Sequence, residues 1–121
     1  MVVLDTNVII DFLEGKEKVV AAINKHAPSE LATTFVNQYE LLKHSSKERS
    51  EEPLSNLLVY QSSETAMHNA AKAYKQLKSS GKIISDNDLM IFGVCVANNE
   101  ILLTQDKGFL HLDSERVKLI E

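Results

Sequence analysis

Two uninterrupted runs of apolar residues in this chain each lead into an acid. The chain begins MVVLDTN, so that residues 2–4 precede Asp5, and a later run, ILLTQD, leads through Thr104 to Asp106. Continuous apolar runs are typical of parallel strands, because such strands are buried on both faces of the sheet. The pattern therefore predicts two buried strands that each carry an acid at the carboxyl end.

The apolar positions along the rest of the chain alternate between strand-like and helix-like spacing. Strands are predicted over 2–5, 30–34, 57–61, 100–104 and 117–120. Helices are predicted over 7–13, 16–26, 36–45, 64–80 and 86–98, and the polar sequence HSSKERSEEP at 44–53 predicts a loop. Because strands that alternate with helices pair in parallel through crossover helices, we expect one three-layer α/β domain over residues 1–121.

The same spacing predicts the buried face of each helix. In the long helix 64–80, which Gly81 is positioned to end, the predicted inward residues are Met67, Ala70, Ala71, Tyr74 and Leu77. In helix 36–45 they are Phe35, Val36, Tyr39 and Leu42, and in helix 16–26 they are Val19, Val20 and Ile23.

The polar residues that follow the two apolar strands have two interpretations. Asp5, Thr6 and Asn7 are all good N-caps, so any of them could simply start the helix at 7–13. Thr104 and Asp106 could likewise belong to an ordinary turn, since the sequence DKG is common in turns. The functional interpretation rests on the pair, because ligands bind outside the carboxyl ends of the strands in open parallel sheets, where both acids are expected.

Three more acids lie on predicted helices. Glu40 is about 40° from Val36 around its helix and borders the apolar stripe, so it either reaches water or takes a partner or a metal. Asp86 and Asp88 open helix 86–98, where Ser85 and Asp88 resemble a capping box and acids suit the helix dipole. Because Asp86 and Asp88 are about 200° apart around a helix, only one of them can face a shared pocket.

Carboxylates that converge on one pocket repel one another and raise each other's pKa, and a divalent cation relieves this repulsion. Mg²⁺ and Mn²⁺ prefer hard oxygen ligands, so either would suit a site made of acids. The four histidines are scattered and give no zinc-like cluster. The single cysteine, Cys95, lies in the apolar sequence IFGVCVA, where a buried and inert thiol is expected.

Composition excludes several classes of protein. With 44% hydrophobic and 25% charged residues, the chain is expected to fold as an ordinary globular domain. The formal net charge of −4, with only two arginines, argues against a general nucleic-acid coat protein, which needs a basic surface. No apolar run approaches the roughly 18 residues of a membrane span and no signal peptide is recognisable, so we expect a cytoplasmic location and no membrane partner.

Four motifs, in order and covering nearly the whole chain, resemble those of the PIN domain family of metal-dependent ribonucleases. The closest similarity is to the VapC-type toxins of prokaryotic toxin–antitoxin systems. The first motif, an apolar strand that ends in Asp followed by Thr or Ser and a polar residue, matches LDTNVIIDFL at Asp5. The second, a Glu in an apolar helix after the second strand, matches NQYELL at Glu40.

The other two motifs lie in the second half of the chain. An Asp before an apolar, Ala-rich helix is matched by DLMIFGVCVA at Asp88, although Phe92 and Gly93 replace the usual pair of alanines. A strand followed by Thr or Ser, one residue, Asp and a nearby aromatic is matched by LLTQDKGF at Thr104 and Asp106. Each motif is weak alone, and the specificity comes from all four in order.

The resemblance implies a five-stranded parallel sheet between helices and hydrolysis of RNA phosphodiester bonds by an endoribonuclease. It implies that Thr6 and Thr104 orient ligands or waters, that Asn7 contacts the substrate, and that Asp86 stays in the cap region or at the pocket rim. It also implies a homodimer and a protein antitoxin as partners. One or two Mg²⁺ or Mn²⁺ ions would be bound by four acids: Asp5, Glu40, Asp88 and Asp106.

Other interpretations of the same residues remain open. A response-regulator receiver would need two adjacent acids after the first strand, where this chain has a single Asp5, and a haloacid-dehalogenase pattern would need Asp at Asn7. Two further alternatives keep the PIN fold: a nuclease that processes RNA outside a toxin–antitoxin system, and an inactive binding module. Metal-dependent cleavage would distinguish an enzyme from the inactive module.

Overall fold

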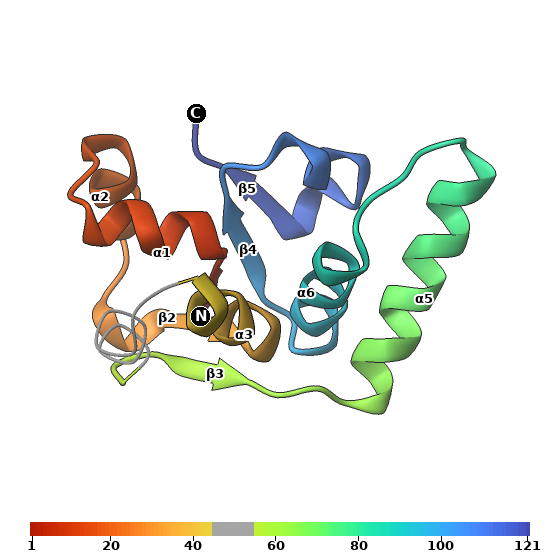
Figure 1. The fold of residues 1–121 in the computed structure, drawn as a ribbon, viewed down its shortest axis with the longest axis horizontal. Coiled ribbons are helices and arrows are strands. Elements are labelled where there is room, and N and C mark those ends of the chain that lie inside the picture. The colour runs from red at the N-terminus through yellow and green to blue at the C-terminus, as the bar shows by residue number, and fades with distance from the viewer. Residues whose placement is uncertain (45–54) are drawn as a thin grey trace.

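The computed structural model describes residues 1–44 and 55–121, and these form a five-stranded sheet flanked by helices (Figure 1). The strands are β1 (Val2–Leu4), β2 (Leu31–Thr34), β3 (Leu58–Tyr60), β4 (Ile101–Thr104) and β5 (Val117–Leu119). The helices are α1 (Thr6–Leu13), α2 (Glu17–Ile23), α3 (Phe35–His44), α5 (Glu64–Ser79) and α6 (Asp86–Ala97). Three short 3-10 turns are η1 (Pro28–Glu30), η2 (Lys107–His111) and η3 (Ser114–Arg116). The predicted loop at 44–53 and the predicted end of helix 36–45 lie, from residue 45 onward, outside the described residues.

All the strand pairs are parallel, in the order β3-β2-β1-β4-β5. β1 is the central strand, where Val3 is level with Ala32 of β2 and with Leu102 of β4. The three-layer α/β fold and the five-stranded parallel sheet are therefore confirmed. Each predicted strand is present and is one or two residues shorter than expected.

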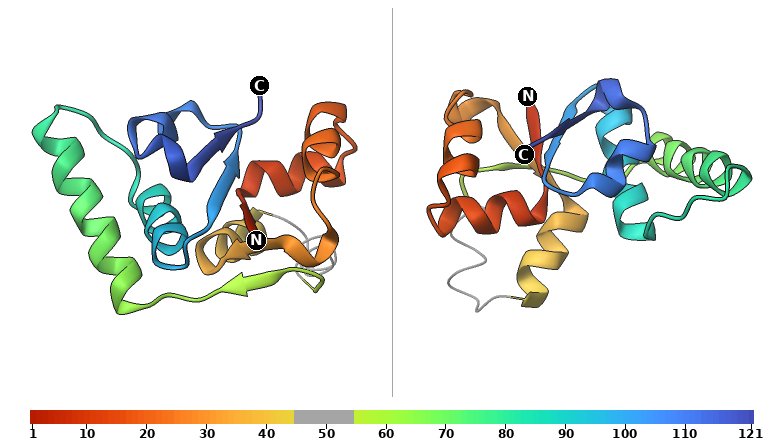
Figure 2. Two further views of the ribbon diagram at one scale, coloured as in Figure 1. Left: turned by 180° about the vertical axis from the view of Figure 1, so that it is seen from behind. Right: turned by 90° about the horizontal axis from the view of Figure 1, so that it is seen from above.

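Helices cover both faces of the sheet, with α1 and α2 on one side and α5 and α6 on the other (Figure 2). Val2, Leu4 and Leu103 pack with buried residues of α1 and α2. The alternate positions Val3 and Leu102 pack with α5 and α6. Because successive residues of one strand point into different layers, the uninterrupted apolar runs are explained by burial on both faces.

Helices α5 and α6 approach each other closely because Gly93 lies between them. A Cβ atom at Gly93 would lie 2.3 Å from the backbone oxygen of Ala66 and 3.1 Å from the Cβ of Ala70. The facing side of α5 is built from small residues, with Ala66, Ala70 and Ala73 all buried. The departure from the family's usual alanine at this position therefore has a packing reason.

The predicted inward face of α5 is confirmed only in part. Ala70 and Leu77 are buried, but Ala71 is exposed and the side chain of Tyr74 is 47% exposed. Ala73 is buried instead, because the contact with α6 selects small residues over the aromatic one. The predicted end of the helix is confirmed.

Gly81 ends α5 with a left-handed backbone conformation, at a φ of +73°. The backbone N–H of Lys82 donates to the carbonyl oxygen of Leu77 at 2.9 Å, which is the hydrogen bond of a Schellman motif. A residue with a Cβ atom is strained in this conformation, so glycine suits the position.

The predicted apolar stripe of α3 is wrong at two positions. Val36 is buried as expected, but Tyr39 is 58% exposed and Leu42 is 46% exposed. The buried face instead includes Asn37 and Leu41. Hydropathy alone misses Asn37, because its burial depends on hydrogen-bond partners at the ends of β1 and β2.

The predicted helix 16–26 is the shorter helix α2, and its inward face is largely confirmed. Val19 and Ile23 are buried, and Val20 is partly exposed. The helix ends at Ile23, and Asn24 follows it as the C-cap.

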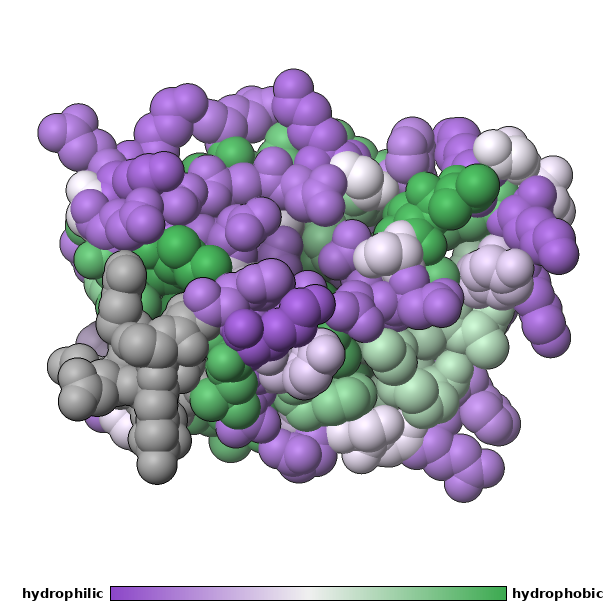
Figure 3. Space-filling view, viewed as in Figure 1, coloured by the Kyte–Doolittle hydropathy of each residue, from purple (hydrophilic) through white to green (hydrophobic). Residues whose placement is uncertain are grey.

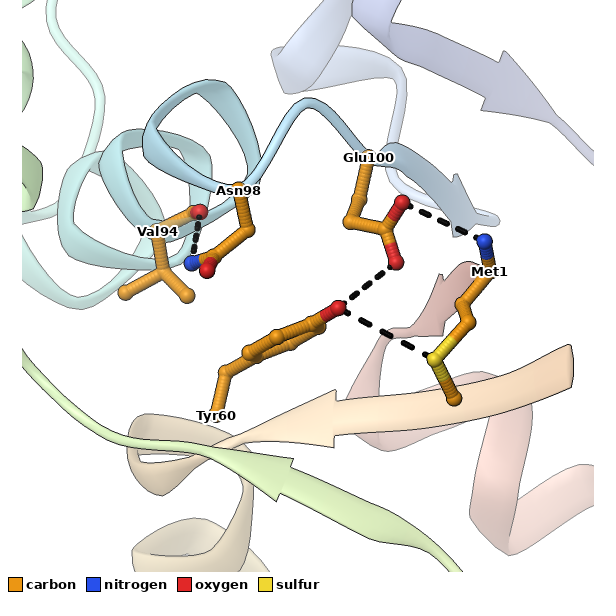
Figure 4. A network of polar contacts seen from close by, with 5 residues as sticks. All are labelled: Met1, Tyr60, Val94, Asn98 and Glu100. Atoms are coloured by element: carbon orange, nitrogen blue, oxygen red, sulfur yellow. Dashed lines mark hydrogen bonds and ion pairs between the residues drawn. The ribbon is translucent and has the colours of Figure 1, made fainter.

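A polar network joins the residues just before β1 and β4 to Tyr60, the last residue of β3 (Figure 4). The carboxylate of Glu100, which is buried just before β4, accepts a hydrogen bond from the hydroxyl of Tyr60 in β3 at 2.8 Å. Its other oxygen lies 3.2 Å from the α-amino group of Met1. Burial and the neighbouring carboxylate raise the pKa of Tyr60 to about 12, so the phenol stays protonated and donates this bond.

Cys95 of α6 is fully buried and unpaired. Burial raises the pKa of its thiol to about 12, so the reactive thiolate form is suppressed at neutral pH. The expectation of a buried thiol is confirmed, and the raised pKa is consistent with a thiol that does not react.

The surface is mostly hydrophilic on the face that Figure 3 shows, with apolar patches between the polar side chains. Tyr39, Leu42 and Tyr74 are among the exposed large apolar residues of the part of the chain that the structure describes. Within that same part, no helix has the length and apolar character needed to cross a membrane.

Candidate active site

The carboxyl ends of β1 and β4 lie side by side and bring Asp5 next to Thr104. The backbone N–H of Asp5 donates to the carbonyl oxygen of Leu103 at 3.0 Å, which continues the pairing of the two strands. The hydroxyl of Thr104 then donates to Oδ2 of Asp5 at 2.6 Å. The two apolar strands therefore deliver their polar ends to one point, as the sequence predicted.

Asp5 has both a structural and an electrostatic role. It is the N-cap of α1, where its Oδ1 accepts a hydrogen bond from the backbone N–H of Thr6 at 2.9 Å. Burial raises the pKa of Asp5, the hydrogen bonds from Thr104 and Thr6 oppose this shift, and the charges of Glu40 and Asp106 add to it. The capping and functional interpretations of this residue are therefore compatible.

Asn37 connects Asp5 to Glu40 through Thr6. Its side-chain nitrogen donates to Oδ1 of Asp5 at 3.2 Å and to the hydroxyl oxygen of Thr6 at 2.9 Å. The Thr6 hydroxyl in turn donates to Oε1 of Glu40 at 2.7 Å. One buried amide thus orients carboxylates that lie on two different helical segments.

The amide of Asn37 is held from the other side by Thr34, the last residue of β2. The Thr34 hydroxyl donates to Oδ1 of Asn37 at 2.7 Å, so the Asn37 nitrogen faces the acids. Both residues are fully buried. Sequence reasoning missed Asn37, although it lies four residues before the apolar Leu41 and therefore on the same side of the helix.

Asp88 approaches the cluster from the first turn of α6. Ser85 is the N-cap, and its side-chain oxygen accepts a hydrogen bond from the backbone N–H of Asp88 at 3.2 Å. Burial, then the charges of Asp5, Asp106 and Glu40, raise the pKa of Asp88 to about 6, against a lowering by the hydrogen bond with Ser85. These four acids therefore share one electrostatic environment.

Asp106 stands at the edge of the cluster, at the start of η2. Its backbone N–H donates to the hydroxyl oxygen of Thr104 at 3.0 Å, and its Oδ1 accepts from the backbone N–H of Gly108 at 2.8 Å. Asp106 is exposed, but its charge reaches the buried carboxylate of Asp5. Asp106 therefore both caps the turn η2 and belongs to the acid cluster, as Asp5 both caps α1 and belongs to it.

The structure does not bring all the predicted residues together. Asp86 is exposed at the first position of α6 and borders a shallow hollow with Tyr74 and Met90, away from the other acids. The cap of α6 is Ser85, so Asp86 is beside the cap and is not the cap itself. Asn7 is exposed at the second position of α1.

The acid cluster has the oxygen ligands of a divalent-cation site, in which water molecules would fill the remaining coordination positions of the ion. Among the residues that the structure describes, no basic side chain contributes to the pKa shift of Asp5 or Asp88, so no described cation neutralises their charge. In residues 1–44 and 55–121, no three acid, histidine or cysteine side chains converge closely enough to enclose an ion by themselves. Mg²⁺ is commonly held by one or two carboxylates and keeps several waters, so the donor set fits.

Fold and site together define an α/β domain with an acidic cluster at the carboxyl edge of its parallel sheet. The chain belongs to the PIN domain family, whose model matches residues 2–115. A comparison with curated proteins by sequence gives no match.

Solved structures share the fold over the whole chain. A toxin–antitoxin complex from Klebsiella pneumoniae contains a chain with 17% identity and a TM-score of 0.80, covering 100% of this chain and 98% of that one. VapBC-1 from nontypeable Haemophilus influenzae gives 24% identity and a TM-score of 0.80, with 98% of each chain covered. DNA-bound VapBC from Salmonella typhimurium gives 21% identity and a TM-score of 0.81, with 100% of each chain covered. At these identities, the comparison shows the fold.

Proposed function

We propose that residues 1–121 form a single nuclease domain that hydrolyses RNA as an Mg²⁺- or Mn²⁺-dependent endoribonuclease in the cytoplasm. The observation that carries this proposal is that four acids from four separate segments lie near enough for their charges to raise the pKa of Asp5 and of Asp88. Membership of the PIN family supports the choice of phosphodiester hydrolysis over other reactions of acidic pockets. The proposed metal ligands are Asp5, Glu40, Asp88 and Asp106.

The residues around these acids have distinct roles in the proposal. A bound divalent ion would supply an acidified water as nucleophile and charge stabilisation for the leaving oxygen. Thr104 and Asn37 hold the carboxylate of Asp5 through hydrogen bonds to its two oxygens, and Thr6 holds that of Glu40. These bonds fix ligand orientation before any ion binds, which lowers the cost of assembling the site.

A cleavage assay on a circularised RNA tests this function, because only an endonuclease can open a substrate without ends. We expect cleavage with Mg²⁺ or Mn²⁺, none in excess chelator, and a loss of several orders of magnitude for Asp5→Asn. Glu115→Gln, which removes an exposed acid of η3, is the matched control and should keep full activity. Equal cleavage by Asp5→Asn and the unmodified protein would refute the assignment, and cleavage of single-stranded DNA alone would refute the substrate class.

We also propose that the protein is the toxin of a toxin–antitoxin pair, because several structures with this fold are such complexes. A cavity of about 590 Å³ between α1, α2 and the segment before β3 offers an apolar surface for an antitoxin segment. Among the residues that line it are Leu4, Ile9, Phe12, Leu13, Ile23, Leu31 and Leu57. Phe12 and Leu13 are exposed at its rim.

Co-expression with the small protein encoded beside the gene tests this role. We expect co-purification and loss of RNA cleavage, and we expect Leu13→Glu to weaken the complex because it places a charge in the apolar cavity. Leu110→Glu, a similarly exposed leucine on η2, is the control. Full cleavage in the presence of every neighbouring small protein would favour an RNA-processing nuclease instead.

We also propose that the protein forms a homodimer. Tyr39 and Leu42 of α3 and Tyr74 of α5 are exposed apolar residues of the kind that protein interfaces use. Light scattering of the purified protein should give the mass of a dimer, and a monomer at high concentration would contradict it.

A further inference from the structure

The segment that carries Asp106 is held from two sides, and one of these sides lies outside the acid cluster. On the cluster side, the backbone N–H of Asp106 donates to Thr104, and Phe109 is buried in the core shared with α5 and α6. On the other side, Gln105 reaches toward α1, where its side-chain nitrogen donates to Oδ2 of Asp11 at 2.8 Å. Asp106 is itself exposed, so its position depends on these anchors.

The two carboxylate oxygens of Asp11 have different partners, and one of them accepts this hydrogen bond. Its side chain is only 19% exposed, and its Oδ1 lies 3.4 Å from the ammonium group of Lys16, which leaves Oδ2 for Gln105. Lys16 also lies 3.7 Å from the carboxylate of Glu14, so the cation is held at the end of α1. The two oxygens of Asp11 thus have separate partners.

Helix α1 connects this contact rigidly to the acid cluster. Asp5 is the N-cap of α1, and Asp11 follows it by six residues, or about 9 Å along the helix axis. A hydrogen bond at Asp11 therefore fixes Gln105 at a set distance from Asp5. Since Asp106 is the next residue, the bond also limits where its carboxylate can lie.

We propose that Asp11 and Gln105 are positioning residues that set the place of Asp106 relative to Asp5. The inference rests on the proposed ribonuclease function, because the value of the placement is to bring Asp106 to the same ion as Asp5. Neither residue is catalytic, since both act through the segment that carries Asp106. Loss of such an outer partner lowers metal affinity or activity by roughly 10–100-fold.

A charge-swap cycle tests the pair. Gln105→Glu sets two carboxylates against each other, whereas adding Asp11→Asn to it restores a donor and an acceptor across the same contact. Asp11→Asn alone keeps one oxygen to accept from Gln105 and should have little effect. Gln76→Glu adds the same charge at an exposed position of α5 and is the matched control.

Two measurements separate positioning from general stability. Hydrogen exchange of the backbone amides of Asp106 and Gly108 should quicken in Gln105→Glu and return to normal in the double variant. Mn²⁺ affinity, measured by calorimetry, should fall by about tenfold or more in the single variant and recover in the double variant. The control should change neither quantity.

The outcomes distinguish this proposal from the proposed function. Normal exchange and affinity in Gln105→Glu, or no recovery on adding Asp11→Asn, would overturn the positioning role. Recovery of exchange in a protein that cleaves no RNA would support the positioning pair and count against the ribonuclease. Recovery of exchange, Mn²⁺ affinity and the kcat for RNA together would support both.

Discussion

Asp88 is the residue at which burial and the charges of the neighbouring acids should together make stability depend on pH. Its pKa is raised to about 6 from the ordinary 3.8, so between these values the folded protein binds a proton that the unfolded chain releases. The free energy of unfolding therefore receives a penalty that grows as the pH rises through this window. Asp88→Asn removes the penalty. In chelator, we expect the Tm difference between variant and unmodified protein to become more positive from pH 4 to pH 7, and a pH-independent difference would contradict the raised pKa of Asp88.

Asp86 and Asp88 should separate cleanly in function. Asp88→Asn should abolish metal-dependent cleavage and reduce the Tm gain caused by Mn²⁺, because it removes the charge of a proposed ligand from the cluster. Asp86→Asn should keep most of the activity, since this side chain is exposed beside Tyr74 and away from the cluster. Cleavage and Mn²⁺-dependent melting measured on both variants check this pair. If Asp86 proved essential and Asp88 replaceable, the third family motif would have been assigned two residues out of place.

Asn37 should matter for both stability and activity. Asn37→Ala leaves the hydroxyl hydrogen of the buried Thr34 without its acceptor and removes one of the two hydrogen bonds that Oδ1 of Asp5 accepts. One unsatisfied buried group typically costs about 1–3 kcal/mol of unfolding free energy. Cleavage should fall as well, because Glu40 loses the support that reaches it through Thr6. Denaturant unfolding and kcat measure the two effects. Asn24→Ala, at the exposed end of α2, is the control and should change both much less.

At the scale of elements, the packing of α5 against α6 depends on one missing methyl group. Gly93→Ala should raise the intrinsic helix propensity of α6 but place a Cβ atom 2.3 Å from the backbone oxygen of Ala66. Overpacking of this kind costs about 1–3 kcal/mol, which exceeds the propensity gain of about 1 kcal/mol at most. We therefore expect a lower Tm by calorimetry. An unchanged or higher Tm would show that the two helices can move apart without cost.

The strands and helices themselves could be predicted because their signals are local. Continuous apolar runs mark β1 and β4, and Gly81 marks the end of α5 through its backbone conformation. The buried faces of α3 and α5 could not be predicted equally well. Tyr39 and Tyr74 fit a helical apolar stripe but are exposed. Asn37 and Ala73 are buried instead, because each contacts residues that lie far away along the chain.

In the candidate site, too, local features could be predicted from the sequence and contacts between distant residues could not. Asp5, Glu40, Asp88 and Asp106 could be found because each stands at a recognisable point, the end of a strand or the edge of a helix. The support for these acids could not be found in this way. The bond between Asp11 and Gln105 joins residues 94 positions apart, and no short pattern records such a contact.

At the scale of the whole molecule, metal binding should be visible as stability. Under the proposed function the folded cluster binds the ion and the unfolded chain does not, so free metal at 100 times its Kd should add about 2.7 kcal/mol to the free energy of unfolding. We expect Mn²⁺ to raise the Tm at pH 7 in calorimetry. Asp5→Asn should lose most of this gain, and Glu17→Gln, an exposed acid at the start of α2, should keep it. Equal gains in all three proteins would indicate binding elsewhere.

The central place of β1 also sets the order in which this protein can become active. Asp5 is synthesised 99 residues before Thr104, its hydrogen-bond partner. At about 5–20 residues per second, this interval is on the order of ten seconds. Until β4 and the turn after it have emerged, the sheet lacks its partner beside β1, and Asp106 is absent from the cluster. Under the proposed function, the site that would cut RNA therefore stays incomplete during this interval, while the chain is still bound to a ribosome made of RNA.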